Sequence, residues 1–82
     1  MTTKEDIREW LKRANKKEDT HMLVVCDSFD YEDYPVYIKR GDDILKVIKE
    51  TCTPDNMQRL MEVYNLSMDL EEQLNTKRVF NY

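Results

Sequence analysis

The residues most able to do chemistry lie in segment 27–35, where carboxylates alternate with aromatic rings. The carboxylates are Asp27, Asp30, Glu32 and Asp33, and the rings between them are Phe29, Tyr31 and Tyr34. Carboxylates this close together repel one another, so a turn that served solubility alone would rarely hold all of them. Metal binding, acid–base catalysis and recognition of a partner are the chemistries that such a segment allows.

Metal binding and catalysis are the weaker interpretations. Calcium and magnesium prefer oxygen ligands, but these acids lack the glycine and the terminal glutamate of an EF-hand loop. A structural zinc site needs about four closely spaced ligands, whereas the chain has two cysteines, Cys26 and Cys52, and a single histidine, His21. An acid pair can divide proton-transfer roles, yet no nucleophile with a neighbouring base accompanies it. We therefore expect no metal ion, no cofactor and no enzymatic activity.

Recognition of a partner explains the segment more simply. Tyrosine rings give a large contact area at low entropic cost, and carboxylates provide directed hydrogen-bond acceptors. This composition suits either a basic protein surface or a ligand with flat rings and N–H donors. A plainer interpretation stays open beside it, in which Phe29 and Tyr34 belong to the core and the acids form a solvated turn.

The sequence around the segment predicts a β-hairpin with the acidic residues at its turn. Apolar residues 22–26 form a continuous run with paired β-branched side chains, which indicates a strand buried on both faces. Residues 34–39 alternate, and Pro35, which cannot donate to a ladder, indicates a sheet edge or a strand start. The turn then spans residues 28–33. A two-stranded hairpin is marginal alone, so its free edge needs a helix, the C-terminal tail or another subunit.

A helix is predicted ahead of this hairpin and another directly after it. Thr3 and Asp6 have the spacing of a capping box, and apolar residues then recur at helical spacing up to residue 14. Gly41 is the only glycine in the chain. It stands where the second strand must turn into a helix that begins near Asp42 or Asp43.

The C-terminal part of the chain is predicted to be mostly helical. The order Thr53, Pro54, Asp55 is typical of a helix start. The apolar residues after it recur at i, i+3, i+4 and i+7, and they are Met57, Leu60, Met61 and Tyr64. Ser67 either caps a separate helix or lies within one bent helix, and the aromatic tail is expected to add a strand or to dock on a neighbour. The predicted order is αββαα, an α+β fold with a possible short C-terminal strand.

Composition bounds the number of domains and the kinds of partner. Residues 1–82 make a single domain, because so short a chain cannot divide its apolar side chains between two cores. A net charge of −4 argues against binding of nucleic-acid duplexes, which needs a basic face. No stretch approaches the ~20 apolar residues that span a bilayer, and no signal peptide precedes the first helix, so we expect a cytoplasmic protein. One small core yields only ~3–5 kcal/mol, which favours a homo-oligomer.

Residues 20–27, 30–37 and 56–64 resemble segments of small bacteriophage and prophage proteins of unassigned function. The similarity spans most of the chain. It implies an accessory protein that acts in a host bacterial cell, and such phage proteins include inhibitors of host defence. It implies no established activity.

Residue types and this context together suggest two binding functions. In the first, an oligomer sequesters a small nucleotide signal of bacterial immunity: tyrosines stack on the base, acids accept from base or ribose, and basic residues meet phosphate. The residues expected to bind this ligand are Asp30, Tyr31, Asp33, Tyr34, Tyr37, Lys39, Arg40 and Arg59. In the second, the acidic segment blocks a basic surface of a host defence protein. We favour sequestration, because −4 is a modest charge for a nucleic-acid mimic; a small metal-dependent enzyme is the remaining alternative.

Overall fold

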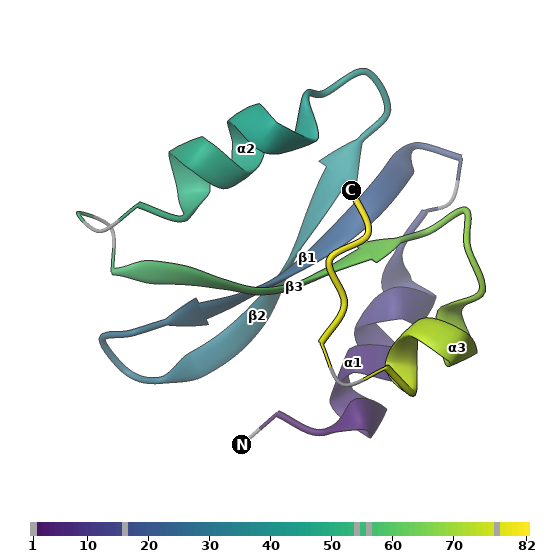
Figure 1. Cartoon of the computed structure of the whole chain (residues 1–82), viewed down its shortest axis with the longest axis horizontal. Coiled ribbons are helices and arrows are strands. Elements are labelled where there is room, and N and C mark those ends of the chain that lie inside the picture. Colours follow the sequence, from purple (N-terminus) through teal and green to yellow (C-terminus); the bar gives the residue numbers. More distant parts are fainter. Residues whose placement is uncertain (1, 16, 54, 56, 77) are drawn as a thin grey trace.

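The computed structural model of the chain, shown in Figure 1, describes residues 2–15, 17–53, 55, 57–76 and 78–82. Its helices and strands follow in the order α1 (Lys4–Arg13), β1 (Asp19–Asp27), β2 (Glu32–Lys39), α2 (Ile44–Thr51), β3 (Gln58–Asn65) and α3 (Leu70–Leu74). The strands form one antiparallel sheet in the order β2-β1-β3. In Figure 1, α2 lies on one side of this sheet, and α1 and α3 lie together on the other. The fold is α+β, as the sequence predicts.

The central strand β1 is buried on both faces, because a helical layer covers each side of the sheet. Met22 and Val24 belong to the cluster under α1 and α3, whereas Leu23 and Val25 belong to the cluster under α2. The predicted buried strand and the hairpin are thus confirmed. β2 lies at the sheet edge, where Pro35 costs no ladder hydrogen bond.

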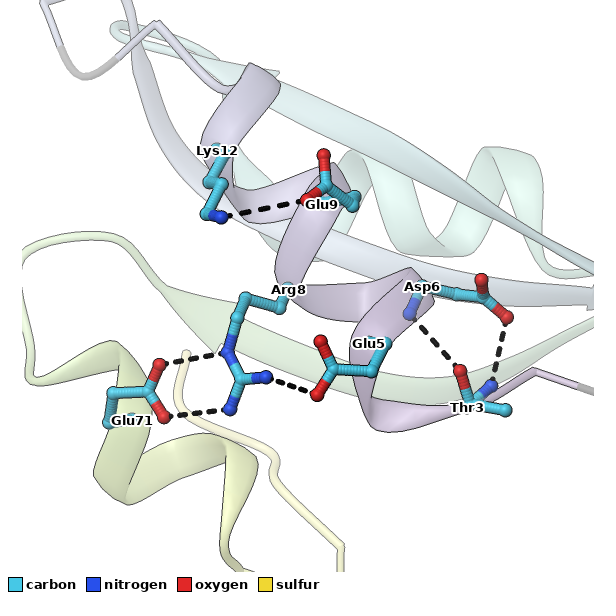
Figure 2. Close-up of polar contacts among 7 residues, drawn as sticks. All are labelled: Thr3, Glu5, Asp6, Arg8, Glu9, Lys12 and Glu71. Atoms are coloured by element: carbon cyan, nitrogen blue, oxygen red, sulfur yellow. Dashed lines mark hydrogen bonds and ion pairs between the residues drawn. The ribbon is translucent and has the colours of Figure 1, made fainter.

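Helix α1 starts with the predicted capping box, drawn in Figure 2. The N–H of Asp6 donates to Oγ1 of Thr3 (3.2 Å), and the N–H of Thr3 donates to the carboxylate of Asp6 (3.0 Å). On an outer face of the helix, Arg8 forms two 3.0 Å hydrogen bonds with the carboxylate of Glu71 in α3. This bidentate pair links the first helix to the last.

Helix α2 begins as the sequence predicts. Gly41 has a φ of +96°, in the region that favours glycine, so the chain can turn sharply after β2. Asp43 then caps the helix, its side chain accepting from the N–H of Leu45 at 3.1 Å. None of the described helices combines the length and apolar character that crossing a membrane requires.

The helix predicted over residues 57–64 is wrong, because Gln58–Asn65 form strand β3. The pairing of β3 with β1 shifts by one residue between Val24 and Val25. Such a bulge resets the alternation of side chains, so apolar residues three apart share a face. Leu60 and Val63 pack under α2, and Met61 and Tyr64 pack on the opposite face. The bulge thus produces in a strand the spacing that is typical of a helix; Pro54, the predicted first helical residue, lies outside the described residues.

A separate helix, α3, follows β3, as one of the two alternatives predicted, but Ser67 is not its cap. Its cap is Asp69, whose side chain accepts from the N–H of Glu72 at 3.2 Å. The tail then returns to the sheet beside β3: Val63 donates to the carbonyl of Val79 (2.7 Å) and accepts from the N–H of Asn81 (3.1 Å). This short parallel contact agrees with the predicted C-terminal strand.

Candidate functional site

The acidic turn between β1 and β2 is held by its own carboxylates. Asp27 accepts a hydrogen bond from the N–H of Phe29 (2.9 Å), and Asp30 accepts one from the N–H of Glu32 (3.1 Å). The N–H of Tyr31 donates to the carbonyl of Asp27 at 2.7 Å. Two of the acids therefore shape the backbone of the turn, in addition to giving it negative charge.

Two aromatic side chains project from this turn into solvent. Phe29 is 78% exposed and Tyr31 is 80% exposed. Tyr31 has a φ of 59°, a left-handed conformation that costs a residue with a side chain roughly 1–2 kcal/mol. The expectation that Phe29 belongs to the core is therefore wrong, whereas the same expectation holds for Tyr34, which packs against the cluster under α2.

Two of the tyrosines expected to stack on a base, Tyr34 and Tyr37, point to opposite faces of β2. The hydroxyl of Tyr34 donates to Oε1 of Gln58 in β3, and that of Tyr37 donates to the carbonyl of Trp10 at 2.7 Å. Burial raises the pKa of both phenols. Both rings anchor β2 to its neighbours, and only Tyr31 stands free of the sheet.

Lys39 and Arg40 lie at the other end of β2. At ~3.3 Å per residue, the length of the strand places Lys39 roughly 20 Å from Asp33. The ammonium of Lys39 lies 2.8 Å from Oδ1 of the buried Asp19, and Nε of Arg40 donates to the carbonyl of Lys17 at 3.2 Å. Within one chain these basic residues cannot meet a ligand held at the acidic turn.

Arg40 instead lines a small cavity at its own end of the sheet. The cavity has a volume of about 260 Å³, and its other lining residues are Asp19, Thr20, His21, Asn65, Leu66 and Ser67. Nδ1 of His21 lies 2.9 Å from Oγ1 of Thr20. Burial lowers the pKa of His21, which favours the neutral imidazole beside Arg40.

Asp33 and Arg59 are brought together at the turn end of the sheet. Both are register partners of Cys26, Asp33 from β2 and Arg59 from β3, so a carboxylate, a thiol and a guanidinium form one row across the strands. Burial raises the pKa of the Cys26 thiol, and its hydrogen bond to Asp33 raises it further. Because the thiolate is the nucleophilic form, Cys26 is poorly suited to covalent catalysis.

Arg59 also lines the largest cavity described, a cleft of about 620 Å³ between α2 and β3. Its lining residues are Ser28, Ile48, Cys52, Thr53, Met57, Gln58, Arg59 and Leu60. The N–H of Ser28 donates to the carbonyl of Met57 at 2.7 Å, which joins the cleft to the acidic turn. Sequence reasoning missed this cleft apart from Arg59, because it treated residues 57–64 as a helix.

Among the described residues, no three histidine, cysteine, aspartate or glutamate side chains gather in a way that could hold a metal ion. No protein-family model matches the chain, and neither does any curated protein or solved structure. The geometry of the turn and of the cleft therefore carries the functional interpretation.

Proposed function

We propose that this chain is a non-enzymatic binding protein whose acidic turn, residues 27–33, engages a basic surface of a partner protein. The observation that carries the proposal is the exposure of Phe29 and Tyr31, at 78% and 80%, between carboxylates on a short turn. Aromatic side chains of this kind commonly supply most of the binding energy of a protein interface.

The turn has the physical properties that this role requires. Its internal hydrogen bonds to Asp27 and Asp30 fix the backbone before the partner arrives, so binding orders few additional groups. Burial of the two rings supplies apolar contact, while the carboxylates speed association with a basic surface and select for it. Such binding weakens as salt screens the charges.

The resemblance to small phage and prophage proteins gives the proposal a biological context. In a host cell, a small acidic protein that covers a basic surface blocks whatever that surface binds. The partner class that fits is a host defence protein whose basic surface contacts nucleic acid, and the function is counter-defence by occlusion.

A second candidate function is sequestration of a small nucleotide, and the cleft between α2 and β3 favours it. Ile48 and Leu60 give the cleft apolar walls against which a base can pack, and Arg59 offers a guanidinium to phosphate. Its volume of about 620 Å³ lies within the usual range of small-molecule pockets. We rank this function second, because the hydroxyls of Tyr34 and Tyr37, two of the rings expected to stack on a base, are bonded within the chain to Gln58 and to the carbonyl of Trp10.

Site-specific photo-crosslinking tests the main proposal. A photo-reactive amino acid replaces Tyr31 in the chain expressed in a bacterial host, and the matched control replaces Leu45, an apolar residue of α2 that is 63% exposed. We expect a discrete partner to crosslink at position 31 and not at position 45, with less product at high salt. Equal crosslinking at both positions contradicts the proposal.

Thermal unfolding separates the second function from the first. A nucleotide held in the cleft at a hundred-fold excess over its dissociation constant adds ~2.7 kcal/mol to stability, and Arg59→Ala removes that gain. Sequestration replaces the protein-binding proposal if two results are found together. Nucleotides raise the melting temperature of the wild type but not of Arg59→Ala, and the photo-reactive residue at position 31 crosslinks to no protein.

A further inference from the structure

The outer edge of β2 carries unpaired backbone groups. In the described part of the chain no strand pairs with this edge, whereas the edge of β3 is partly covered by the tail at Val63. Such an edge is a ready template for pairing with another chain. Its occupant can be deduced from the direction of the backbone groups and from the charges along the strand.

The direction in which each N–H and C=O group of β2 points follows from the hydrogen bonds of its neighbour β1. Pro35 of β2 lies opposite Val24 of β1. The backbone groups of even-numbered residues in and beside β1 form hydrogen bonds on the β3 side. The N–H of Ser28 donates to the carbonyl of Met57 (2.7 Å), and the carbonyl of Thr20 accepts from the N–H of Leu66 (3.0 Å). Val24 shares that direction, so the groups opposite it in β2 point outward. The residues whose backbone groups point outward are therefore Asp33, Pro35, Tyr37 and Lys39, and of these the carbonyl of Lys39 already accepts from the N–H of Asp42 at 3.0 Å.

The charges along β2 are complementary to those of an antiparallel copy. The strand begins with Glu32 and Asp33 and ends with Lys39, followed by Arg40. A second copy in antiparallel orientation places acids opposite bases at both ends of the pair, which stabilises cross-strand pairing. A parallel copy in register would place like charges together.

We propose that β2 pairs with β2 of a second copy of this chain, antiparallel about a two-fold axis at Val36. A two-fold axis perpendicular to a sheet pairs one residue with itself, and in this register Glu32 faces Arg40 and Asp33 faces Lys39 of the other copy. In this register the N–H of Lys39 can donate to the carbonyl of Asp33, and the N–H of Tyr37 to the carbonyl of Pro35. The carbonyl of Tyr37 gains no donor, because Pro35 has no N–H, and the carbonyl of Lys39 already accepts from the N–H of Asp42. The dimer continues the sheet through both copies.

Neighbouring registers are less favourable. An axis at Pro35 sets two prolines opposite each other and leaves Asp33 facing Tyr37. An axis at Tyr37 sets Asp33 against Gly41 and removes both charge pairs. Of these three registers, only the axis at Val36 sets acids opposite bases at both ends of the strand pair.

The dimer brings the acidic turn of one copy close to Lys39 and Arg40 of the other. Within one chain these bases lie at the far end of β2 from Asp33. In the dimer, the two-fold axis places them beside Asp33 of the other copy. The inference is independent of the proposed function, since the turn can bind a partner as a monomer. Loss of the dimer and loss of partner binding are therefore distinguishable.

Charge exchange tests the register. At millimolar concentration, light scattering should give twice the chain mass of 10.0 kDa. Glu32→Arg creates a repulsion at two symmetric positions, and we expect the dimer to dissociate about tenfold more readily. Adding Arg40→Glu in the same chain should restore the affinity to within about threefold. Asp55→Arg, a matched change at an exposed position outside β2, should have no effect. A monomer at every concentration, or a dimer that Glu32→Arg leaves unchanged, overturns the proposal.

A crosslink gives a second test that does not depend on charge. Residues that face each other without mutual hydrogen bonds have Cα atoms about 4.5 Å apart, within the range that a disulfide bridges. Oxidised Val36→Cys should form an intermolecular bridge between the two position-36 thiols, mapped by mass spectrometry to separate it from Cys26 and Cys52. The control is Asp55→Cys. Bridging at position 36 no faster than at position 55 overturns the proposed axis.

Discussion

The side-chain amide of Gln73 forms a pair of hydrogen bonds with the backbone of Asn65 at the end of β3. Oε1 accepts from the N–H of Asn65 at 2.9 Å, and Nε2 donates to its carbonyl at 3.0 Å. Oε1 also accepts from the side chain of Asn81 at 3.0 Å. One buried side chain thus joins α3, β3 and the C-terminal tail.

Gln73→Leu should weaken this junction. Leucine is of similar size but apolar, so the substitution leaves the buried backbone groups of Asn65 without their partners, and we expect the free energy of unfolding to fall by about 1–3 kcal/mol in urea titrations. Hydrogen exchange at Val63 and Asn81, which bridge β3 and the tail, should accelerate more than exchange in β1. Glu72→Gln, on the exposed face of α3, is the control. Unchanged protection of the tail would refute the assigned role of Gln73.

Asp19 should make stability depend on pH in the acid range. Burial opposes its ionisation, but the hydrogen bonds from Lys39 and from the N–H of Asn15 (2.9 Å) together lower its pKa below the usual 3.8. The unfolded chain therefore takes up the proton at a higher pH than the folded one. The stability that the ion pair contributes is present above about pH 3.8 and is lost as the pH falls through the folded pKa.

Asp19→Asn measures this contribution. At pH 7 the variant should be less stable than the wild type by about 1–3 kcal/mol, and the difference should narrow progressively below pH 4. Chemical denaturation across the pH range measures both the stability difference at pH 7 and its decrease below pH 4. A difference that stays constant down to pH 2 would show that the carboxylate charge is irrelevant.

Glu62 should have the opposite effect. Burial raises its pKa above the usual 4.5, and the hydrogen bond from the Tyr64 hydroxyl (3.1 Å) offsets this only in part. The folded state therefore holds this proton more tightly than the unfolded state, and stability falls as the pH rises through the interval between the two pKa values.

Glu62→Gln removes the buried charge and keeps an acceptor for Tyr64. We expect the unfolding free energy of the variant to exceed that of the wild type at pH 7, and the two to be equal at pH 4 or below. Glu72→Gln serves again as the exposed control. Equal stability of the two proteins at pH 7 would contradict the assigned effect of burial.

Tyr31 should separate binding from stability. Its φ of 59° suits glycine, so Tyr31→Gly should leave the unfolding free energy unchanged or raise it by about 1 kcal/mol. The same change removes an exposed ring from the turn. Loss of stability in Tyr31→Gly would mean that the ring supports the fold, contrary to its exposure.

The successes and failures of the sequence predictions have specific physical causes. The cap at Thr3 and the turn at Gly41 were predictable because each depends on a few adjacent residues. Strand β3 was not, because the bulge opposite Val24 and Val25 gives Leu60 and Met61 a spacing that a helix also shows. Local pattern cannot reveal a bulge that exists only in the pairing of two distant strands.

In the candidate site, too, features set by adjacent residues were predictable and features set by tertiary packing were not. The turn and its carboxylates follow from residues 27–35 alone, but the exposure of Phe29 depends on how the hairpin packs. The separation of Lys39 from Asp33 follows from strand geometry once β2 is known. The cleft beside Arg59 required the correct assignment of β3.

We propose that the exposed rings of the acidic turn bind a partner protein. Once crosslinking at position 31 has identified that partner, equilibrium titration of the purified pair measures what each ring contributes to the affinity. We predict that Phe29→Ala and Tyr31→Gly each weaken binding at least about tenfold while both variants remain folded, and that Leu45→Ala leaves it unchanged. Equal affinity of the turn variants and the wild type would show that these rings do not bind the partner.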